Sequence, residues 1–223
     1  MPEAQFQLAC VYRCGDGVAV NEDQGAAWYL RAAEAGHLLA MSNLSACYHH
    51  GTGVAANASR AFAWLRRSAE GGLPRAQYEL SYRFEHGIGV PADTHEALVW
   101  LRRSAEGGYR DAQHNLAVHY QCGQWMPVDA EQAVAWYTRA AEAGDPQAQT
   151  NLGGCLLLGE GVTADAVQAV AWFHAAAKGG EPNAYWALSA CYRNGTGVAA
   201  DAEQAAAWFD KALAVEGSAL DAK

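Results

Sequence analysis

The sequence predicts an all-α fold, an α/α superhelical solenoid of six helix-turn-helix repeats, each 36 residues long. Two series of residues keep this period along the whole chain: a tryptophan, from Trp28 to Trp208, and a turn glycine, from Gly15 to Gly195. In addition, the segment WLRRSAEGG occurs identically at 64 and at 100. A helix pair of this size cannot bury its own apolar stripe, so the six copies are expected to stack on one another.

The first helix of each repeat is predicted from a stripe of residues at four-residue steps. In the first copy the stripe consists of Ala4, Leu8 and Tyr12, and similar residues recur in the later copies, although Leu156 stands in the tyrosine column of the fifth. This spacing places the three side chains on one face of a helix. Gly15 is expected to end that helix.

The second helix is predicted from signals at both of its ends. Each copy has an Asn or Asp where an N-cap is expected, namely Asn21, Asn57, Asp93, Asp129, Asp165 and Asp201. In five copies a Gln or Glu follows three residues later, which is the spacing of a capping box; Arg60 is the exception. The tryptophan lies within this helix, and its column is expected to pack in the core. Glycines suited to a left-handed C-terminal cap follow in five copies, at Gly36, Gly72, Gly108, Gly144 and Gly180.

We expect one domain over residues 1–223. The six repeats should occupy about 3–37, 38–73, 74–109, 110–145, 146–181 and 182–217, and a short tail, 218–223, should follow them.

These columns resemble the Sel-1-like repeat family, a relative of the tetratricopeptide repeat. The family pattern runs approximately A-x-x-x-L-x-x-x-Y-x-x-G-x-G-V, then D-x-x-x-A, then W-x-x-x-A-A-x-x-G, and the match covers residues 4 to about 213. The resemblance implies a solenoid that binds other proteins, as an adaptor or as a bacterial immunity protein that neutralises a secreted toxin. It implies no catalytic residue.

Composition and charge narrow the classes of partner. The net charge of −9 repels nucleic acid and anionic membranes, so we expect neither as a partner. Most of the negative charge falls on the C-terminal half, which either favours a basic protein or peptide partner or reflects solvated acidic helix surfaces. The chain has no run of about 18 apolar residues, and its start lacks the pattern of a signal peptide, which together predict a cytoplasmic protein.

The sequence contains no recognisable catalytic motif, and no cofactor is predicted. The repeated G-x-G lies at helix-to-helix turns without a preceding strand, which favours turn geometry over a phosphate loop. Some members of the resembled family carry disulfide-bridged cysteine pairs in every repeat, but here only Cys10 and Cys14 share one, at a helical spacing that does not suit a disulfide. We therefore expect six free thiols. A metal- or thiol-dependent enzyme remains the alternative from another class, with His50, His86 and Cys122 as the ligands.

The predicted binding site lies on the first helices. If Leu8 and Tyr12 face the core, positions 7, 11 and 14 of each repeat form a stripe opposite it, which lines the concave face of related superhelices. Polar and aromatic groups gather in the central repeats, and such a mixed surface suits a protein or peptide. The predicted partner-binding residues are Asn43, Cys47, His50, Glu79, Tyr82, Arg83, His86, Asn115, His119 and Trp125.

Trp125 stands where the other five copies have the second glycine of the turn. That glycine is expected to adopt a positive φ, which a tryptophan adopts only with strain. Two interpretations stay open. Either the indole folds back over Met126 and a neighbouring repeat, or it stands out as an anchor for the partner.

Overall fold

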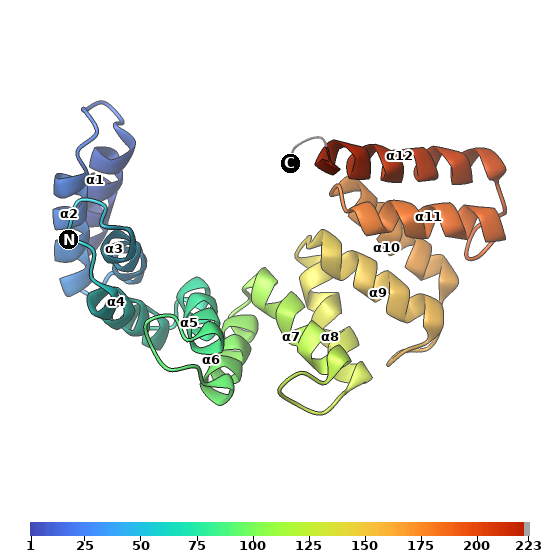
Figure 1. Cartoon of the computed structure of the whole chain (residues 1–223), viewed down its shortest axis with the longest axis horizontal. Coiled ribbons are helices and arrows are strands. Elements are labelled where there is room, and N and C mark those ends of the chain that lie inside the picture. The colour runs from blue at the N-terminus through green and yellow to red at the C-terminus, as the bar shows by residue number, and fades with distance from the viewer. Residues whose placement is uncertain (221–223) are drawn as a thin grey trace. The chain divides into compact units, whose positions relative to one another are not determined.

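The computed structural model describes residues 1–220, and within this range all regular structure is α-helical (Figure 1). Two helices form each repeat. They are α1 (Pro2–Cys14), α2 (Glu22–Glu34), α3 (Leu38–His50), α4 (Ala58–Glu70), α5 (Pro74–His86), α6 (Thr94–Glu106), α7 (Arg110–Cys122), α8 (Ala130–Glu142), α9 (Pro146–Leu158), α10 (Ala166–Lys178), α11 (Pro182–Asn194) and α12 (Ala202–Leu220). The last helix continues into the stretch expected to be a tail, and residues 221–223 of that stretch lie outside the described residues.

The predicted N-caps of the even-numbered helices are confirmed in all six repeats. The side chain of Asn21 accepts a hydrogen bond from the backbone N–H of Gln24, three residues later. Equivalent bonds to Asn57, Asp93, Asp129, Asp165 and Asp201 measure 2.9 to 3.1 Å. Each bond satisfies a backbone donor that the first turn of a helix would otherwise leave unpaired.

The glycines lie where the backbone adopts the left-handed conformation. Gly15 ends α1 with φ 75°, and Gly36 follows the end of α2 with φ 90°, as predicted for both positions. The second glycine of the turn has a further role in some repeats, because a Cβ on Gly53 would overlap the carbonyl oxygen of Glu22 in the preceding repeat. A side chain at this point would separate the two repeats.

The leucine column of the odd-numbered helices forms the centre of the core. Leu44, Leu80, Leu116 and Leu188 are all fully buried or nearly so. On the side that faces the even-numbered partner helix, small residues allow close packing, and three buried serines donate hydrogen bonds across the pair. Their Oγ atoms lie 2.7 to 2.9 Å from the carbonyl oxygens that accept, as in the bond from Ser45 to Ala61.

The tryptophan column is only partly in the core. Trp100 and Trp136 are buried, as predicted, whereas the other four are half-buried; of these, Trp28 and Trp64 pack against the core. The next residue along the helix fills the core more consistently, at Tyr29, Leu65, Leu101, Tyr137 and Phe173. The tryptophan lies at the edge of the core, where a cation covers its ring: the guanidinium of Arg67 lies 4.8 Å from the ring centre of Trp64, and that of Arg103 lies 4.6 Å from Trp100.

The chain divides into two compact units, Met1–Tyr109 and Arg110–Lys223, each with three repeats. Within each unit the helices pack in the order of the sequence: each pair packs together, and its second helix packs on the first helix of the next pair. The single domain expected from the sequence stays a prediction. Within the described part of the chain, no helix combines the length and apolar character needed to cross a membrane.

Candidate functional site

The face of the odd-numbered helices that points away from the core is made by positions 7, 10 and 14 of each repeat, and we call it the odd-helix face. With Leu8 at the centre of the core, a helical advance of about 100° per residue places positions 7, 10 and 14 on the far side. Position 11 lies only about 60° from the centre, within the buried stripe. The predicted stripe therefore contains two surface positions, 7 and 14, and one core position, 11.

Burial separates the predicted site residues into three groups. His50, Tyr82 and His86 are exposed, and Asn43, Glu79, Asn115 and Trp125 are half-buried. Cys47, Arg83 and His119, which all occupy position 11, are buried with exposed fractions of 2, 5 and 7%. The residues up to His86 belong to the first unit, and Asn115, His119 and Trp125 belong to the second.

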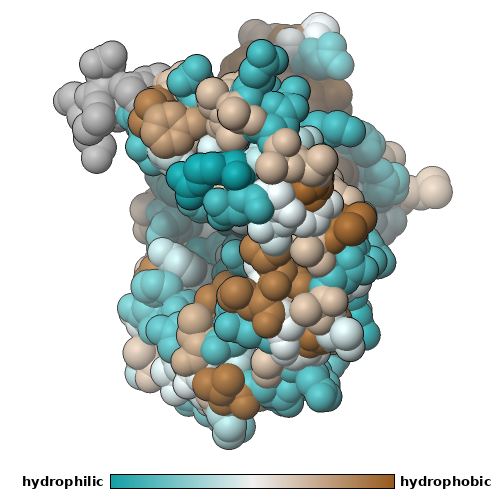
Figure 2. All heavy atoms as spheres, turned by 90° about the vertical axis from the view of Figure 1, so that its right-hand side faces the viewer, coloured by the Kyte–Doolittle hydropathy of each residue, from teal (hydrophilic) through white to brown (hydrophobic). Residues whose placement is uncertain are grey.

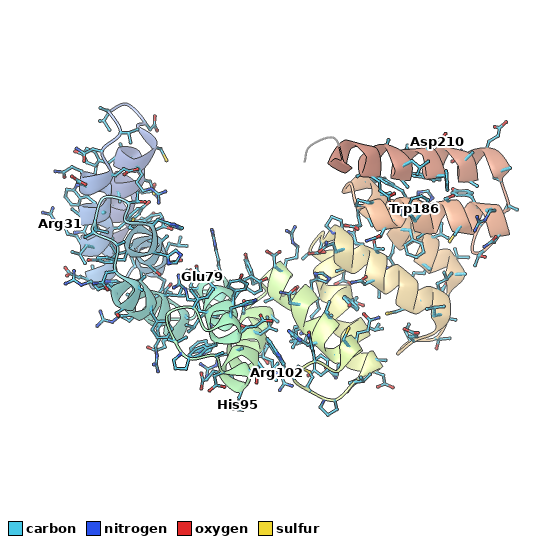
Figure 3. All side chains as sticks on the ribbon, in the orientation of Figure 1. Arg31, Glu79, His95, Arg102, Trp186 and Asp210 are labelled. Atoms are coloured by element: carbon cyan, nitrogen blue, oxygen red, sulfur yellow. The ribbon has the colours of Figure 1, made fainter. Side chains whose placement is uncertain are left out.

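Arg83 is held in place by an ion pair within α5. Its Nη2 donates to Oε1 of Glu79 at 3.0 Å, one turn earlier in the helix, while its buried Nε has no hydrogen-bond partner. The expectation that Arg83 lies on a stripe opposite the core is wrong, because position 11 packs beside the core stripe. Glu79, labelled in Figure 3, is the exposed partner of this pair: 40% of its side chain is accessible, against 6% for Arg83.

The odd-helix face of the first unit is hollowed on both sides of Tyr82. One pocket, of about 280 Å³, is lined by His49, His50, Glu79, Tyr82, Arg83 and Ile88. A second, of about 250 Å³, is lined by Arg75, Tyr78, Glu79, Tyr82 and Tyr109. The two pockets share Tyr82 and Glu79, so these side chains stand between them. Arg75, Tyr78 and Tyr109 were not predicted, although the helical period that places position 10 on this face also places positions 3 and 6 there.

The second unit has a polar pocket of about 250 Å³, which the sequence did not predict. It is lined by His114, Gln147, Thr150, Asn151, Glu181 and Asn183. Most of these groups already bond within the unit: Nδ2 of Asn151 lies 3.3 Å from Nε2 of His114, and Oε1 of Glu181 accepts from Nδ2 of Asn183 at 3.0 Å. The pocket is therefore a hydrogen-bonded part of the surface that carries no specific chemistry.

Apolar side chains are also exposed on the second unit, and Figure 2 shows such groups gathered among polar ones. The large exposed apolar residues here are Val128, Leu158, Val167, Phe209, Leu213 and Val215. Trp186, which lies between α11 and α12 in Figure 3, packs edge-on against Phe209 with 5.1 Å between the ring centres. It is half-buried.

Trp125 packs against its own repeat. It adopts φ 64°, the single positive φ among the described residues other than glycine, as predicted for this turn position. Its indole stacks on the imidazole of His119, with 4.1 Å between the ring centres and 23° between the planes. The indole therefore folds back, but onto His119 of its own repeat; the expected contact with Met126 and a neighbouring repeat stays a prediction. Burial lowers the pKa of His119, because a charged imidazole is poorly solvated there.

Trp125→Gly is expected to restore the turn residue of the other repeats and to uncover His119. The lost packing should outweigh the relieved strain, so the free energy of unfolding should fall by about 1 kcal/mol or more. The pKa of His119 should rise towards 6.5, its ordinary value. The folded wild type disfavours the protonated imidazole, so neutral His119 contributes stability above about pH 6.5, and this contribution is lost as the pH falls. The variant should lose less stability over the same pH range. Denaturation at several pH values and NMR titration of the imidazole measure both effects, and an unchanged His119 pKa would contradict the stacking role.

The cysteines are all free thiols in the structure. Cys47, Cys155 and Cys191 are buried, and burial raises the pKa of each. Among the described residues no three His, Cys, Asp or Glu side chains come together as a metal site requires. Cys122 belongs to a different unit from His50 and His86. The absence of a metal stays a prediction.

Comparison with known proteins identifies the repeat. The Sel1 repeat family model matches residues 2–37, 38–73, 74–109, 110–145, 146–181 and 182–214. No curated protein matches the chain.

Solved structures share the fold. A Sel1 repeat protein from Oxalobacter formigenes is 33% identical, with a TM-score of 0.82 over 96% of this chain and 88% of that one. A protective antigen of uropathogenic Escherichia coli with an SLR fold is 30% identical, with a TM-score of 0.87 over 96% of this chain. This chain spans 46% of the length of that antigen. An immunity protein from Pseudomonas aeruginosa is 20% identical, with a TM-score of 0.54 over 97% of this chain and 82% of that one, and this likeness shows the fold alone.

Proposed function

The chain belongs to the Sel1 repeat family, and we propose that it is a non-catalytic scaffold that binds another protein or peptide on its odd-helix face. Proteins built from Sel1 repeats generally mediate protein–protein interactions. A rigid stack of helix pairs is suited to this role, because the framework holds the surface side chains in fixed positions before the partner arrives.

The observation that carries the proposal is the surface around Tyr82. Tyr82 is 48% exposed although it is a large aromatic residue, and it stands between two pockets. Its ring also lies 4.0 Å from that of His86, which holds it in place. An exposed, oriented aromatic beside pockets and charged groups has the properties of a binding hot spot.

Within this proposal the ten predicted site residues take different roles. The exposed and half-buried ones meet the partner: Asn43, His50, Glu79, Tyr82 and His86 in the first unit, and Asn115 in the second. The buried Cys47, Arg83 and His119 support them from beneath. Trp125 stacks on His119 and belongs to the packed framework. No single surface is implied across the two units.

The alternative of a thiol enzyme is disfavoured for three of the six cysteines, Cys47, Cys155 and Cys191. The nucleophile of such an enzyme is a thiolate, and burial raises the pKa of three of the thiols, which keeps them protonated. The narrower hypothesis of an immunity protein stays a prediction, because a shared fold says nothing of the partner. A toxin encoded beside this protein, and neutralised by it, would establish that hypothesis.

The proposal is tested by the affinity of a partner captured on the immobilised chain. Tyr82→Ala combined with His86→Ala should weaken binding by about 2 kcal/mol or more. The melting temperature should hardly change, since both side chains are exposed. Arg66→Ala, at an exposed position of α4, is the matched control and should bind normally. Unaltered affinity of the double variant would remove the first unit's odd-helix face from the proposal.

A further inference from the structure

We infer that the pocket lined by Tyr78, Tyr82 and Tyr109 binds a cationic side chain of the partner, a lysine ammonium or an arginine guanidinium. The inference rests on the proposed function and adds the chemistry that the partner must present. We call this pocket the tyrosine pocket. Its remaining lining residues are Glu79 and Arg75.

The walls of the tyrosine pocket are aromatic rings set at an angle to one another. The ring centres of Tyr78 and Tyr109 lie 5.1 Å apart, with 45° between the ring planes. Tyr82, one helical turn after Tyr78 on α5, supplies the third ring. The face of an aromatic ring carries partial negative charge and attracts a cation within about 6 Å of its centre. Three such rings around one volume of about 250 Å³ suit a cation better than an anion.

Of the two charges in the Glu79–Arg83 ion pair, the negative one faces the tyrosine pocket. Glu79 is the accessible member, whereas the guanidinium of Arg83 is covered and already donates to one carboxylate oxygen. Arg83 also lines the other pocket and not this one. A ligand that enters the tyrosine pocket therefore meets the carboxylate of Glu79 beside the rings.

Arg75 is the one group in the tyrosine pocket that opposes a cation. It is exposed at the start of α5, so its long side chain can leave the pocket when a ligand enters. Because Arg75 and Glu79 carry opposite charges, variants of the two can test the sign of the charge on the ligand. Removal of Arg75 should help a cation and harm an anion, and neutralisation of Glu79 should do the reverse.

The test uses four acetylated and amidated pentapeptides of the form Gly-Gly-X-Gly-Gly, with Lys, Arg, Met or Glu at X, titrated into the full chain. NMR signals of labelled tyrosines report binding. The Lys and Arg peptides should bind at least about fivefold more tightly than the Met and Glu peptides. For the Lys peptide, Tyr82→Ala and Glu79→Gln should each weaken binding about fivefold or more, and Arg75→Ala should strengthen it about twofold.

Several outcomes would overturn the inference. Equal affinity for Lys and Met would mean an apolar pocket, and preference for Glu with tighter binding by Glu79→Gln would mean an anion pocket. No saturable shift with the Lys or Arg peptide up to about 10 mM would mean no cation site of useful affinity. Melting curves of each variant control for folding. Failure here would leave the scaffold proposal standing if Tyr82→Ala with His86→Ala still weakens the captured partner.

Discussion

Arg83→Glu should lower the free energy of unfolding by about 3 kcal/mol or more, because it places a carboxylate in a buried position beside Glu79. The wild-type residue is 5% exposed. Its ion pair with Glu79 offsets the buried charge. In the variant the attraction becomes a repulsion, and the new charge is poorly solvated. Chemical denaturation measures the change.

Arg66→Glu is the matched control for this experiment. Arg66 forms the same type of pair with Glu70, one helical turn away at 2.8 Å, but 58% of its side chain is exposed. Solvent screens such a pair, so the control should change stability by about 0.5 kcal/mol or less. Similar values for both variants would show that Arg83 is not part of the packed structure.

Trp100→Ala should cost about 3 to 5 kcal/mol, the range typical of a large aromatic removed from a core. Trp100 is 5% exposed, and its Nε1 donates to Glu96 at 3.1 Å. The loss combines the burial of the indole with the cavity left behind. The free energy of unfolding, from denaturant titration followed by circular dichroism, reports it.

Trp64→Ala offers an unusually close control, because the nine residues from Trp64 are identical to those from Trp100. Trp64 is only half-buried, so its removal should cost clearly less. The difference would measure the deeper packing of Trp100 together with its bond to Glu96, in whose place the Trp64 helix has Arg60. A loss below about 1 kcal/mol for Trp100→Ala would show that this tryptophan is not core.

The fold followed from the sequence because each structural signal occurs six times. Asn21 and its equivalents predicted the helix starts, and Gly15 and its equivalents predicted the turns, since caps and left-handed turns depend on local residue type. The placement of the tryptophans was harder to predict. Trp64 and Trp100 are followed by the same eight residues and still differ in burial, which depends on contacts with other parts of the chain.

The site could be predicted only in part, for a geometric reason. Tyr82 and His86 were placed on the surface correctly, because positions 10 and 14 lie far from the core stripe. Arg83 was assigned with positions 7 and 14 to a stripe opposite the core, whereas its angular position next to Phe84 predicts burial. The tyrosine pocket was missed because Tyr109 reaches it from the loop before the next repeat, where helical periodicity gives no guidance.

Hydroxyl-radical footprinting of the complex with its protein partner tests the central claim, that the odd-helix face is the binding surface, most directly. Oxidation of each aromatic residue is compared with and without saturating partner. We predict protection of Tyr82, His50 and His86, with Trp28 and Trp64 of the even-numbered helices oxidised equally in both states. Protection of Trp28 and Trp64 with unchanged oxidation of Tyr82 would contradict the claim.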